Sequence, residues 1–228
     1  MKVRSEFSKY AIHYGSHNVI QSRVAEYLLR KLSLKPKNIL DLGCGSGALC
    51  KIISWEYQKF TGIDFASEML ELHPKSDKVH SVYGDFNDKK LFKKLSTNKY
   101  DYIFSASALQ WAENLDMVFK NISLLNAPVA FAIFTANTFK TLNETALLEP
   151  MLRTAEDIYE LQKKYFDAEF EIVNYKLEFE STREMFKYIK HSGVSASRKV
   201  LDYKQTKKLM NEYPLKYLEF EVVFITSR

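Results

Sequence analysis

Residues 38–48 read NILDLGCGSGA and follow Pro36 closely. The first five residues form a short apolar run that suits a strand, and apolar residues recur at helical spacing from Leu49 to Ile53, so the stretch predicts a strand, a glycine-rich turn and a helix. Such a turn lets a ligand approach the backbone closely and directs a helix N-terminus at it. Three of only seven glycines in the chain fall inside this turn, at positions 43, 45 and 47. This clustering favours a ligand cradle over a plain turn.

Two carboxylates indicate what the turn holds. Asp41 lies in the approach to the turn, where it would suit an ammonium group better than a pyrophosphate. Asp64 ends a second short strand-like run, residues 60–64, and an acid at that position suits a ribose diol. The turn also matches G-x-G-x-x-A from Gly43 to Ala48, so an NAD-dependent oxidoreductase is an alternative.

Composition narrows the class of protein. The chain has 228 residues, of which 46% are hydrophobic and 27% charged, as in an ordinary globular domain. No apolar run approaches the roughly 18 residues that a membrane helix needs, and the first residues lack an apolar signal core. Two cysteines, Cys44 and Cys50, are too few for a disulfide framework, and no spacing suggests a metal site. We therefore expect a cytoplasmic protein with neither a metal nor a membrane segment.

Charge is unevenly distributed along the chain. The formal net charge is +5. Residues 1–37 hold eight basic and two acidic side chains, and residues 181–228 hold ten basic and five acidic ones. This pattern leaves open either two solvated faces or a basic surface for an acidic partner. Nucleic acid is disfavoured because no basic run is interleaved with aromatic residues.

The first part of the chain predicts an α/β fold with a doubly wound, mostly parallel, seven-stranded sheet. Further strand-like runs occur at residues 79–83, 100–104 and 129–134, and helical periodicity separates them. This alternation is typical of a parallel sheet. An amphipathic helix is predicted over residues 20–33, and Asn114 is a candidate N-cap for the helix before the fifth strand.

The part after Thr135 changes pattern. Residues 138–166 predict one or two helices, and residues 169–180 alternate imperfectly, which suggests a strand with a bulge. The remaining predicted elements are helices at 182–190 and 204–212 and a last strand at 218–224.

The chain is predicted to form one domain over residues 1–228, because it shows neither a repeat nor a low-complexity linker. Within it we expect an N-terminal helical lid at 1–35, a cofactor-binding core at 36–135, and a helical insertion with C-terminal strands at 136–228. We expect a monomer or a weak dimer.

The run LDLGCGSG at residues 40–47, together with GIDFASEML at residues 62–70, resembles the first two motifs of class I S-adenosylmethionine-dependent methyltransferases. The resemblance implies a Rossmann-like fold, S-adenosylmethionine as cofactor and S-adenosylhomocysteine as product. In that class the acid and apolar pair at the positions of Asp85 and Phe86 lies beside the adenine. The cofactor-binding residues that the resemblance implies are Gln21, Asp41, Gly43, Cys44, Gly45, Gly47, Asp64, Phe65, Met69, Asp85, Phe86 and Ser105.

Other stretches are similar to one family of this class, the malonyl-acyl-carrier-protein O-methyltransferases of biotin biosynthesis. These are FSKYAIHY at residues 7–14, SALQW at 107–111, FTANTFKTLNE at 134–144 and FKYIKHSG at 186–193. The resemblance implies methyl transfer to the free carboxylate of a malonyl thioester on acyl carrier protein. It places three residues on the acceptor side of the site as catalytic candidates, namely Tyr14, Gln110 and Trp111.

Other functions stay open at this stage. The chain could methylate another small acid or a nitrogen acceptor, or it could bind the cofactor without catalysis. Base-methylating relatives would carry Asn/Asp-Pro-Pro-Tyr after the fourth strand, and residues 105–108 read SASA instead, which argues against nucleic-acid bases as acceptors.

Overall fold

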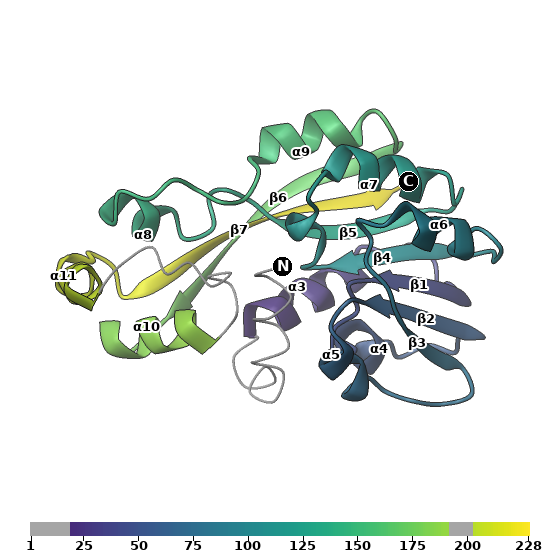
Figure 1. The fold of residues 1–228 in the computed structure, drawn as a ribbon, viewed down its shortest axis with the longest axis horizontal. Helices are drawn as coiled ribbons and strands as arrows, with labels where there is room; N and C mark the ends of the chain where they lie inside the picture. The colour runs from purple at the N-terminus through teal and green to yellow at the C-terminus, as the bar shows by residue number, and fades with distance from the viewer. Residues whose placement is uncertain (1–18, 192–202) are drawn as a thin grey trace.

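The computed structural model describes residues 19–191 and 203–228. It contains one seven-stranded sheet with the order β3-β2-β1-β4-β5-β7-β6, flanked by helices on both faces (Figure 1). The strands are β1 (Asn38–Leu42), β2 (Lys59–Asp64), β3 (Val79–Tyr83), β4 (Tyr102–Ala106), β5 (Val129–Phe134), β6 (Ala168–Glu178) and β7 (Tyr217–Ser227). The predicted doubly wound, mostly parallel sheet is therefore confirmed.

Strands β1 to β5 pair in parallel, and β7 pairs antiparallel with both β5 and β6. The first strands run parallel because helices cross over between them, namely α4 (Ala48–Ile52), α5 (Ser67–Glu71), α6 (Lys89–Leu95) and α7 (Leu115–Ser123). All carboxyl ends of β1 to β5 therefore meet at one edge of the sheet. Open α/β sheets bind ligands at this edge.

The hydrophobic core has two layers, one on each face of the sheet. Successive residues of a strand enter opposite layers: Ile39 packs in one layer and Leu40 in the other, and the same holds for Phe104 and Ile103. Every residue of β5 is buried, as expected for a central strand covered on both faces. Burying one such large apolar side chain contributes about 1.5–3 kcal/mol.

Side-chain caps define where several helices begin. The Asn114 Oδ1 atom accepts a hydrogen bond from the Met117 N–H at 3.0 Å at the start of α7, which confirms the predicted N-cap. Helix α9 (Ala155–Gln162) begins with a capping box between Thr154 and Asp157. Each such cap stabilises its helix by about 1 kcal/mol.

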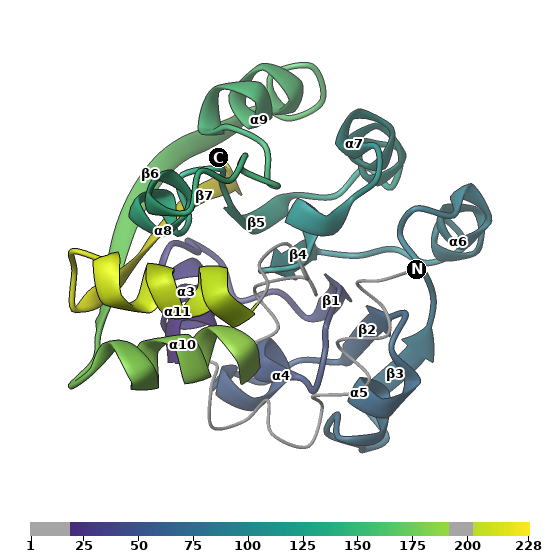
Figure 2. The same cartoon turned by 60° about the vertical axis from the view of Figure 1, so that its left-hand side comes forward.

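The antiparallel pair β6 and β7 extends beyond the parallel strands. Figures 1 and 2 show α8 (Lys140–Thr145), α10 (Thr182–His191) and α11 (Tyr203–Glu212) gathered around its far end, away from β1 to β3. The register from Ala168 opposite Ser227 to Glu178 opposite Tyr217 is unbroken, so the predicted bulge is wrong. The apolar alternation shifts because Phe170 packs toward α9, whereas later residues of β6 pack on the opposite face of the sheet.

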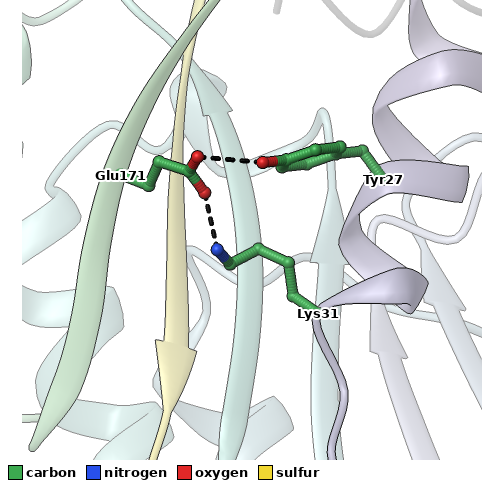
Figure 3. A network of polar contacts seen from close by, with 3 residues as sticks. All are labelled: Tyr27, Lys31 and Glu171. Atoms are coloured by element: carbon green, nitrogen blue, oxygen red, sulfur yellow. Dashed lines mark hydrogen bonds and ion pairs between the residues drawn. The ribbon is translucent and has the colours of Figure 1, made fainter.

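Helix α3 (Val19–Arg30) is fastened to the sheet through a polar network (Figure 3). The Tyr27 hydroxyl donates a hydrogen bond to the Glu171 Oε1 atom at 2.9 Å, and the Lys31 ammonium lies 2.6 Å from Glu171 Oε2. The Tyr27 ring also packs edge-on against Phe224 of β7 at 4.8 Å between ring centroids. The network fixes the helix that carries Gln21, one of the expected site residues. In the described ranges, no helix combines the length and apolarity that a membrane span requires.

Candidate functional site

The turn after β1 contains three glycines in the left-handed region, with φ of 75° at Gly43, 52° at Gly45 and 83° at Gly47. A Cβ at Gly43 would lie 2.1 Å from Ala108 Cβ, and one at Gly47 would lie 2.4 Å from Pro74 Cδ. A Cβ at Gly45 would meet nothing within 4 Å. Two of the glycines thus permit close packing of protein on protein, and Gly45 faces open space.

The end of β2 holds this turn in place. The Asp64 carboxylate accepts hydrogen bonds from the N–H groups of Gly45 and Ala66, both at 2.8 Å, and the Ile63 carbonyl accepts from the Gly43 N–H at 2.7 Å. Burial raises the pKa of Asp64, and the N–H donors oppose that rise because they favour the ionised carboxylate. The carboxylate therefore links the turn to β2 at the position where a ribose is expected.

A cleft lies over the turn, at the carboxyl edge of β1, β2 and β4. Its apolar walls come from Phe65, Met69, Phe86 and Trp111. Apolar walls with a few polar groups are typical of a small-molecule site. The cleft has a volume of about 70 Å³, enough for a few waters.

Several polar atoms in or near this wall lack a hydrogen-bond partner within the described residues. Gln21 Oε1 and Ser107 Oγ belong to lining residues, whereas Asp41 Oδ1 and Gln110 Oε1 belong to residues outside the lining. Buried polar atoms are normally paired, and an unpaired one is explained by a missing ligand or water. With the open space at Gly45 and the acid at Asp64, these atoms fit the expected cofactor, which carries a ribose and an amino-acid group.

Asp41 is fully enclosed between β2 and β4, opposite Gly62 and Phe104. Burial, and secondarily the nearby Asp64, raise the pKa of Asp41 to about 8. At neutral pH this carboxyl is therefore mostly protonated in the ligand-free chain. Asp41 is not among the residues that line the cleft, and its contact with a ligand ammonium stays a prediction.

Cys44 is among the residues that line the cleft, and its buried thiol lies 3.7 Å from the Gly45 carbonyl oxygen. Burial raises its thiol pKa well above the usual value, and the carboxylates of Asp41 and Asp64 add to that rise. The thiol therefore stays protonated at neutral pH and is a poor nucleophile. The described residues contain no group of three or more His, Cys, Asp or Glu side chains placed to hold a metal ion.

The structure brings most of the expected site residues together. Those in the cleft wall are Gln21, Gly43, Cys44, Gly45, Asp64, Phe65, Met69, Phe86 and Trp111. Tyr14 lies outside the described residues, so its acceptor-side role stays a prediction.

Other expected residues lie close by but outside the wall. Ser105 donates to the Leu42 carbonyl at 2.7 Å and thus joins β4 to β1. Asp85 is exposed and accepts from both the backbone and the side-chain N–H of Asn87, at 2.8 and 2.9 Å. Gln110 donates to the Ser107 carbonyl at 2.7 Å. Their proposed direct contacts with cofactor or acceptor stay predictions.

Sequence reasoning missed several wall residues, among them Ala25, Ser46 and Ser107. Ala25 and Ser46 are adjacent in space to predicted residues but carry no chemical signal of their own. Ser107 is recognisable only from its backbone, which has a φ of 64°.

Comparison with known proteins gives consistent results. A family described as "Methyltransferase domain" matches residues 34–219. A malonyl-[acyl-carrier protein] O-methyltransferase of Acetivibrio thermocellus is 27% identical over 264 aligned positions, which cover 99% of this chain and 93% of that protein. The same-named protein of Priestia megaterium is 28% identical over 62% of this chain, and the match spans only 54% of that relative.

Solved structures show the same fold at low sequence identity. A putative methyltransferase from Bacillus halodurans has a TM-score of 0.62 and 10% identity, covering 88% of this chain and 96% of that one. The plantazolicin methyltransferase, solved with a desmethyl substrate analogue and S-adenosylhomocysteine, has a TM-score of 0.55 and 17% identity, covering 99% and 95%.

Proposed function

We propose that this chain, which belongs to the methyltransferase-domain family, transfers a methyl group from S-adenosylmethionine to the free carboxylate of a malonyl thioester on acyl carrier protein. The enzyme is an S-adenosylmethionine-dependent methyltransferase. The observation that carries the choice of acceptor is the match to the Acetivibrio thermocellus malonyl-[acyl-carrier protein] O-methyltransferase over 99% of this chain. That match includes the segments outside the cofactor motifs. A place in biotin synthesis follows from the same proposal.

When bound, S-adenosylmethionine supplies a methyl group made electrophilic by its sulfonium. Asp64 would hold the ribose hydroxyls, the turn around Gly45 would allow close approach of the backbone, and Phe65, Met69 and Phe86 would enclose the adenine. Support comes from the acid at the end of β2, the open space at Gly45 and the apolar wall.

The acceptor needs little chemical help. A carboxylate has a reference pKa of about 4, so it is ionised at neutral pH and needs no general base. One carboxylate oxygen forms a bond to the methyl carbon while the carbon–sulfur bond breaks and its electron pair goes to sulfur. The chain's task is to align the reactants and remove water from the nucleophile. Trp111 and Phe86 in the cleft wall are suited to excluding water.

Carrier-protein docking is proposed from charge. Within the described residues, Arg183 and Lys187 lie on α10, and Arg23 and Arg30 lie on α3. Two further basic residues of the chain, Arg198 and Lys199, lie outside the described residues. An acidic carrier would be attracted to this set, and added salt would weaken that attraction. We expect a cytoplasmic location, since both cysteines are free thiols.

An acceptor screen with mass detection tests the proposal. The purified chain and S-adenosylmethionine are incubated separately with malonyl carrier protein, with a malonyl thioester of a small thiol, with the same thioester already capped as its methyl ester, and with other small carboxylic acids. We expect the first two to become methyl esters, with the carrier-bound one losing more rate with salt, and the capped one to stay unchanged. Methylation of other small acids but not of either malonyl thioester would replace this acceptor with the alternative one.

A further inference from the structure

His73 is a buried histidine outside the cleft wall. It follows α5 in the chain, and only 3% of the residue is exposed. Its ring lies 5.8 Å from the ring of Phe60 in β2, measured between the centroids. Histidine is on average only intermediate in burial, so a nearly enclosed imidazole calls for a structural explanation.

Two glycines leave the space that this ring fills. A Cβ at Gly47 would lie 2.9 Å from His73 Cδ2 and 3.0 Å from His73 Nε2, and a Cβ at Gly62 would lie 3.1 Å from His73 Nε2. Gly47 ends the turn after β1 and is the N-cap of α4, and Gly62 lies in β2. The imidazole therefore packs against the turn that is expected to hold the cofactor.

His73 thereby connects two parts of the cleft wall. One part is the turn after β1, which contributes Gly45, and the other is α5, which contributes Met69. The backbone of His73 stays attached to α5, because its N–H donates to the Leu70 carbonyl at 3.3 Å. A displacement of the ring would therefore act on the turn and on α5 together.

The surroundings of the imidazole suit its neutral form. The Nδ1 atom lies 3.0 Å from the Pro74 carbonyl oxygen, which can only accept, so Nδ1 carries the hydrogen. The Nε2 atom is buried and has no hydrogen-bond partner within the described residues. A second proton, on Nε2, would therefore bury a positive charge whose N–H group has no acceptor. Such a group is costly to bury.

The charged groups around the ring do not offset this cost. Burial lowers the pKa of His73, the hydrogen bond to the Pro74 carbonyl opposes that shift, and the positive charge of Lys51 on α4 adds to it. This pKa is not shifted by the other titratable side chains of the turn, β2 and α5, namely Cys44, Lys59, Asp64, Glu68 and Glu71. In the folded chain at neutral pH the ring is therefore uncharged.

We propose that the neutral imidazole of His73 is a positioning residue for the turn that holds the methyl donor, and that protonating this ring weakens cofactor binding. The ring supports Gly47 and β2 while it is uncharged. A charged ring has to leave this place or draw water toward it, and either change loosens the turn. The inference rests on the cofactor and holds whichever acceptor the chain methylates.

Two substitutions remove the titration of this side chain in different ways. His73→Phe keeps a ring that fills the space beside Gly47 and cannot take up a proton. His73→Asn keeps an N–H group near the position of Nδ1 but leaves part of that space empty, so it should melt below the wild type. His80→Asn is the matched control, because His80 is an exposed histidine in β3.

Calorimetric titration with S-adenosylhomocysteine between about pH 5 and about pH 7.5 measures how the Kd depends on protonation. The wild type and His80→Asn should bind more weakly in acid. The ratio of their Kd values at the two ends of this range should be at least about threefold larger than the ratio in His73→Phe and His73→Asn. Asp41 and Asp64 are present in all of these proteins, so their titration cancels from the comparison. A purely structural role would change Tm and the Kd at neutral pH but not this ratio.

The imidazole resonance of His73 gives a check on the wild-type chain itself. A ligand that prefers the neutral ring must lower the pH at which the ring takes up its proton, by the factor by which protonation weakens the ligand. NMR titration with and without S-adenosylhomocysteine measures this midpoint, and we expect a lower value in the complex. An identical midpoint, or equal ratios of Kd in the wild type and His73→Phe, would overturn the proposal.

The outcome for the proposed function is read separately. A chain that shows this pH-dependent binding but does not methylate malonyl thioesters would refute the proposed acceptor and support the role of His73. A chain that methylates malonyl thioesters while His73→Phe keeps the wild-type ratio of Kd values would support the proposed function and refute that role.

Discussion

The carboxylate of Asp64 accepts a hydrogen bond from the backbone N–H of Gly45 at 2.8 Å. One residue ends β2 and the other is the glycine that faces open space in the turn after β1. The contact therefore joins the two sequence motifs that suggested the cofactor. Changes at either residue should affect cofactor binding, but through different physical causes.

Gly45→Val should block cofactor binding. Its φ of 52° is one that residues with a Cβ rarely adopt, so the variant carries backbone strain and should melt below the wild type. The new side chain meets nothing within 4 Å at its Cβ. It would occupy the space through which the ligand approaches the backbone, and we expect the Kd for S-adenosylhomocysteine to rise roughly tenfold or more. Calorimetry measures the Kd, and circular dichroism checks the fold. Gly47→Ala is the contrast, because its Cβ would collide with Pro74 and should lower Tm. Retained affinity in Gly45→Val would contradict the role of the turn as a cradle.

Asp64→Ala should lower both affinity and stability. It leaves ribose hydroxyls without their acceptor, which we expect to weaken cofactor binding by about 1–3 kcal/mol. It also leaves the N–H groups of Gly45 and Ala66 without their acceptor, so Tm should fall. Asp64→Asn keeps the shape of the side chain and one carbonyl oxygen, so the losses of cofactor affinity and of Tm should both be smaller. A Kd equal to that of the wild type in Asp64→Ala would contradict the ribose-binding role.

Asp41 should make the ligand-free chain less stable as pH rises. Its pKa is about 8 in the folded chain against an ordinary 3.8, so the folded state keeps a proton that the unfolded state loses between these values. Stability contributed by this group is therefore present at low pH and lost as pH rises toward about 8. Asp41→Asn cannot titrate and should flatten that part of the slope, which urea unfolding across the range measures. Asp77→Asn, at an exposed position, is the control. An unchanged slope in Asp41→Asn would contradict the prediction.

Glu171→Gln should loosen the attachment of α3 to β6. The Glu171 carboxylate, which is about 39% exposed, contacts Lys31 and Tyr27, so we expect a loss of only about 0.5 kcal/mol. The hydrogen bond from Lys31, followed by that from Tyr27, lowers the pKa of Glu171. The stability that the ionised Glu171 contributes is therefore present above its ordinary pKa of 4.5. It fades as the pH falls through the lowered pKa of the folded chain. The difference in Tm between Glu171→Gln and the wild type should shrink as the solution becomes acidic. A difference that stays constant with pH would contradict this prediction.

Trp111 should report ligand binding by its fluorescence. It lines the cleft, whereas Trp55, the other tryptophan, donates to the Pro36 carbonyl outside the cleft wall. In a Trp55→Phe background, titration with S-adenosylhomocysteine should change the emission, because a ligand in the cleft would lie close to the Trp111 indole. Trp111→Phe, which keeps Trp55, should show little change. Calorimetric binding without an emission change in the Trp55→Phe chain would place the ligand elsewhere.

The strands and the glycine turn were predictable because their signals are local. Apolar runs such as residues 129–134 must be buried strands, and clustered glycines at 43, 45 and 47 match three left-handed residues. The continuous register of β6 was not predictable, since its two halves pack on different faces. This depends on packing against α3, which lies far away in the sequence, and against α9, which directly precedes β6.

The placement of Asp64 and Phe86 at one cleft was predictable, because an acid and an aromatic residue each signal a type of ligand contact. Side-chain contacts were less predictable where only the fold decides which way a side chain turns. Asp85 turns to Asn87 and Gln110 turns to the Ser107 backbone, and neither choice is visible in the sequence. Ser107 escaped attention because its significance lies in its backbone angle and its unpaired hydroxyl.

The central claim is that the turn after β1 holds a sulfonium methyl donor. Calorimetric titration of the full chain with S-adenosylmethionine, S-adenosylhomocysteine and NAD, repeated on Gly45→Val, tests it most directly. We predict saturable binding of the first two, none of NAD, and loss of both in the variant. Tight binding of NAD alone, or donor binding that Gly45→Val leaves intact, would contradict the claim.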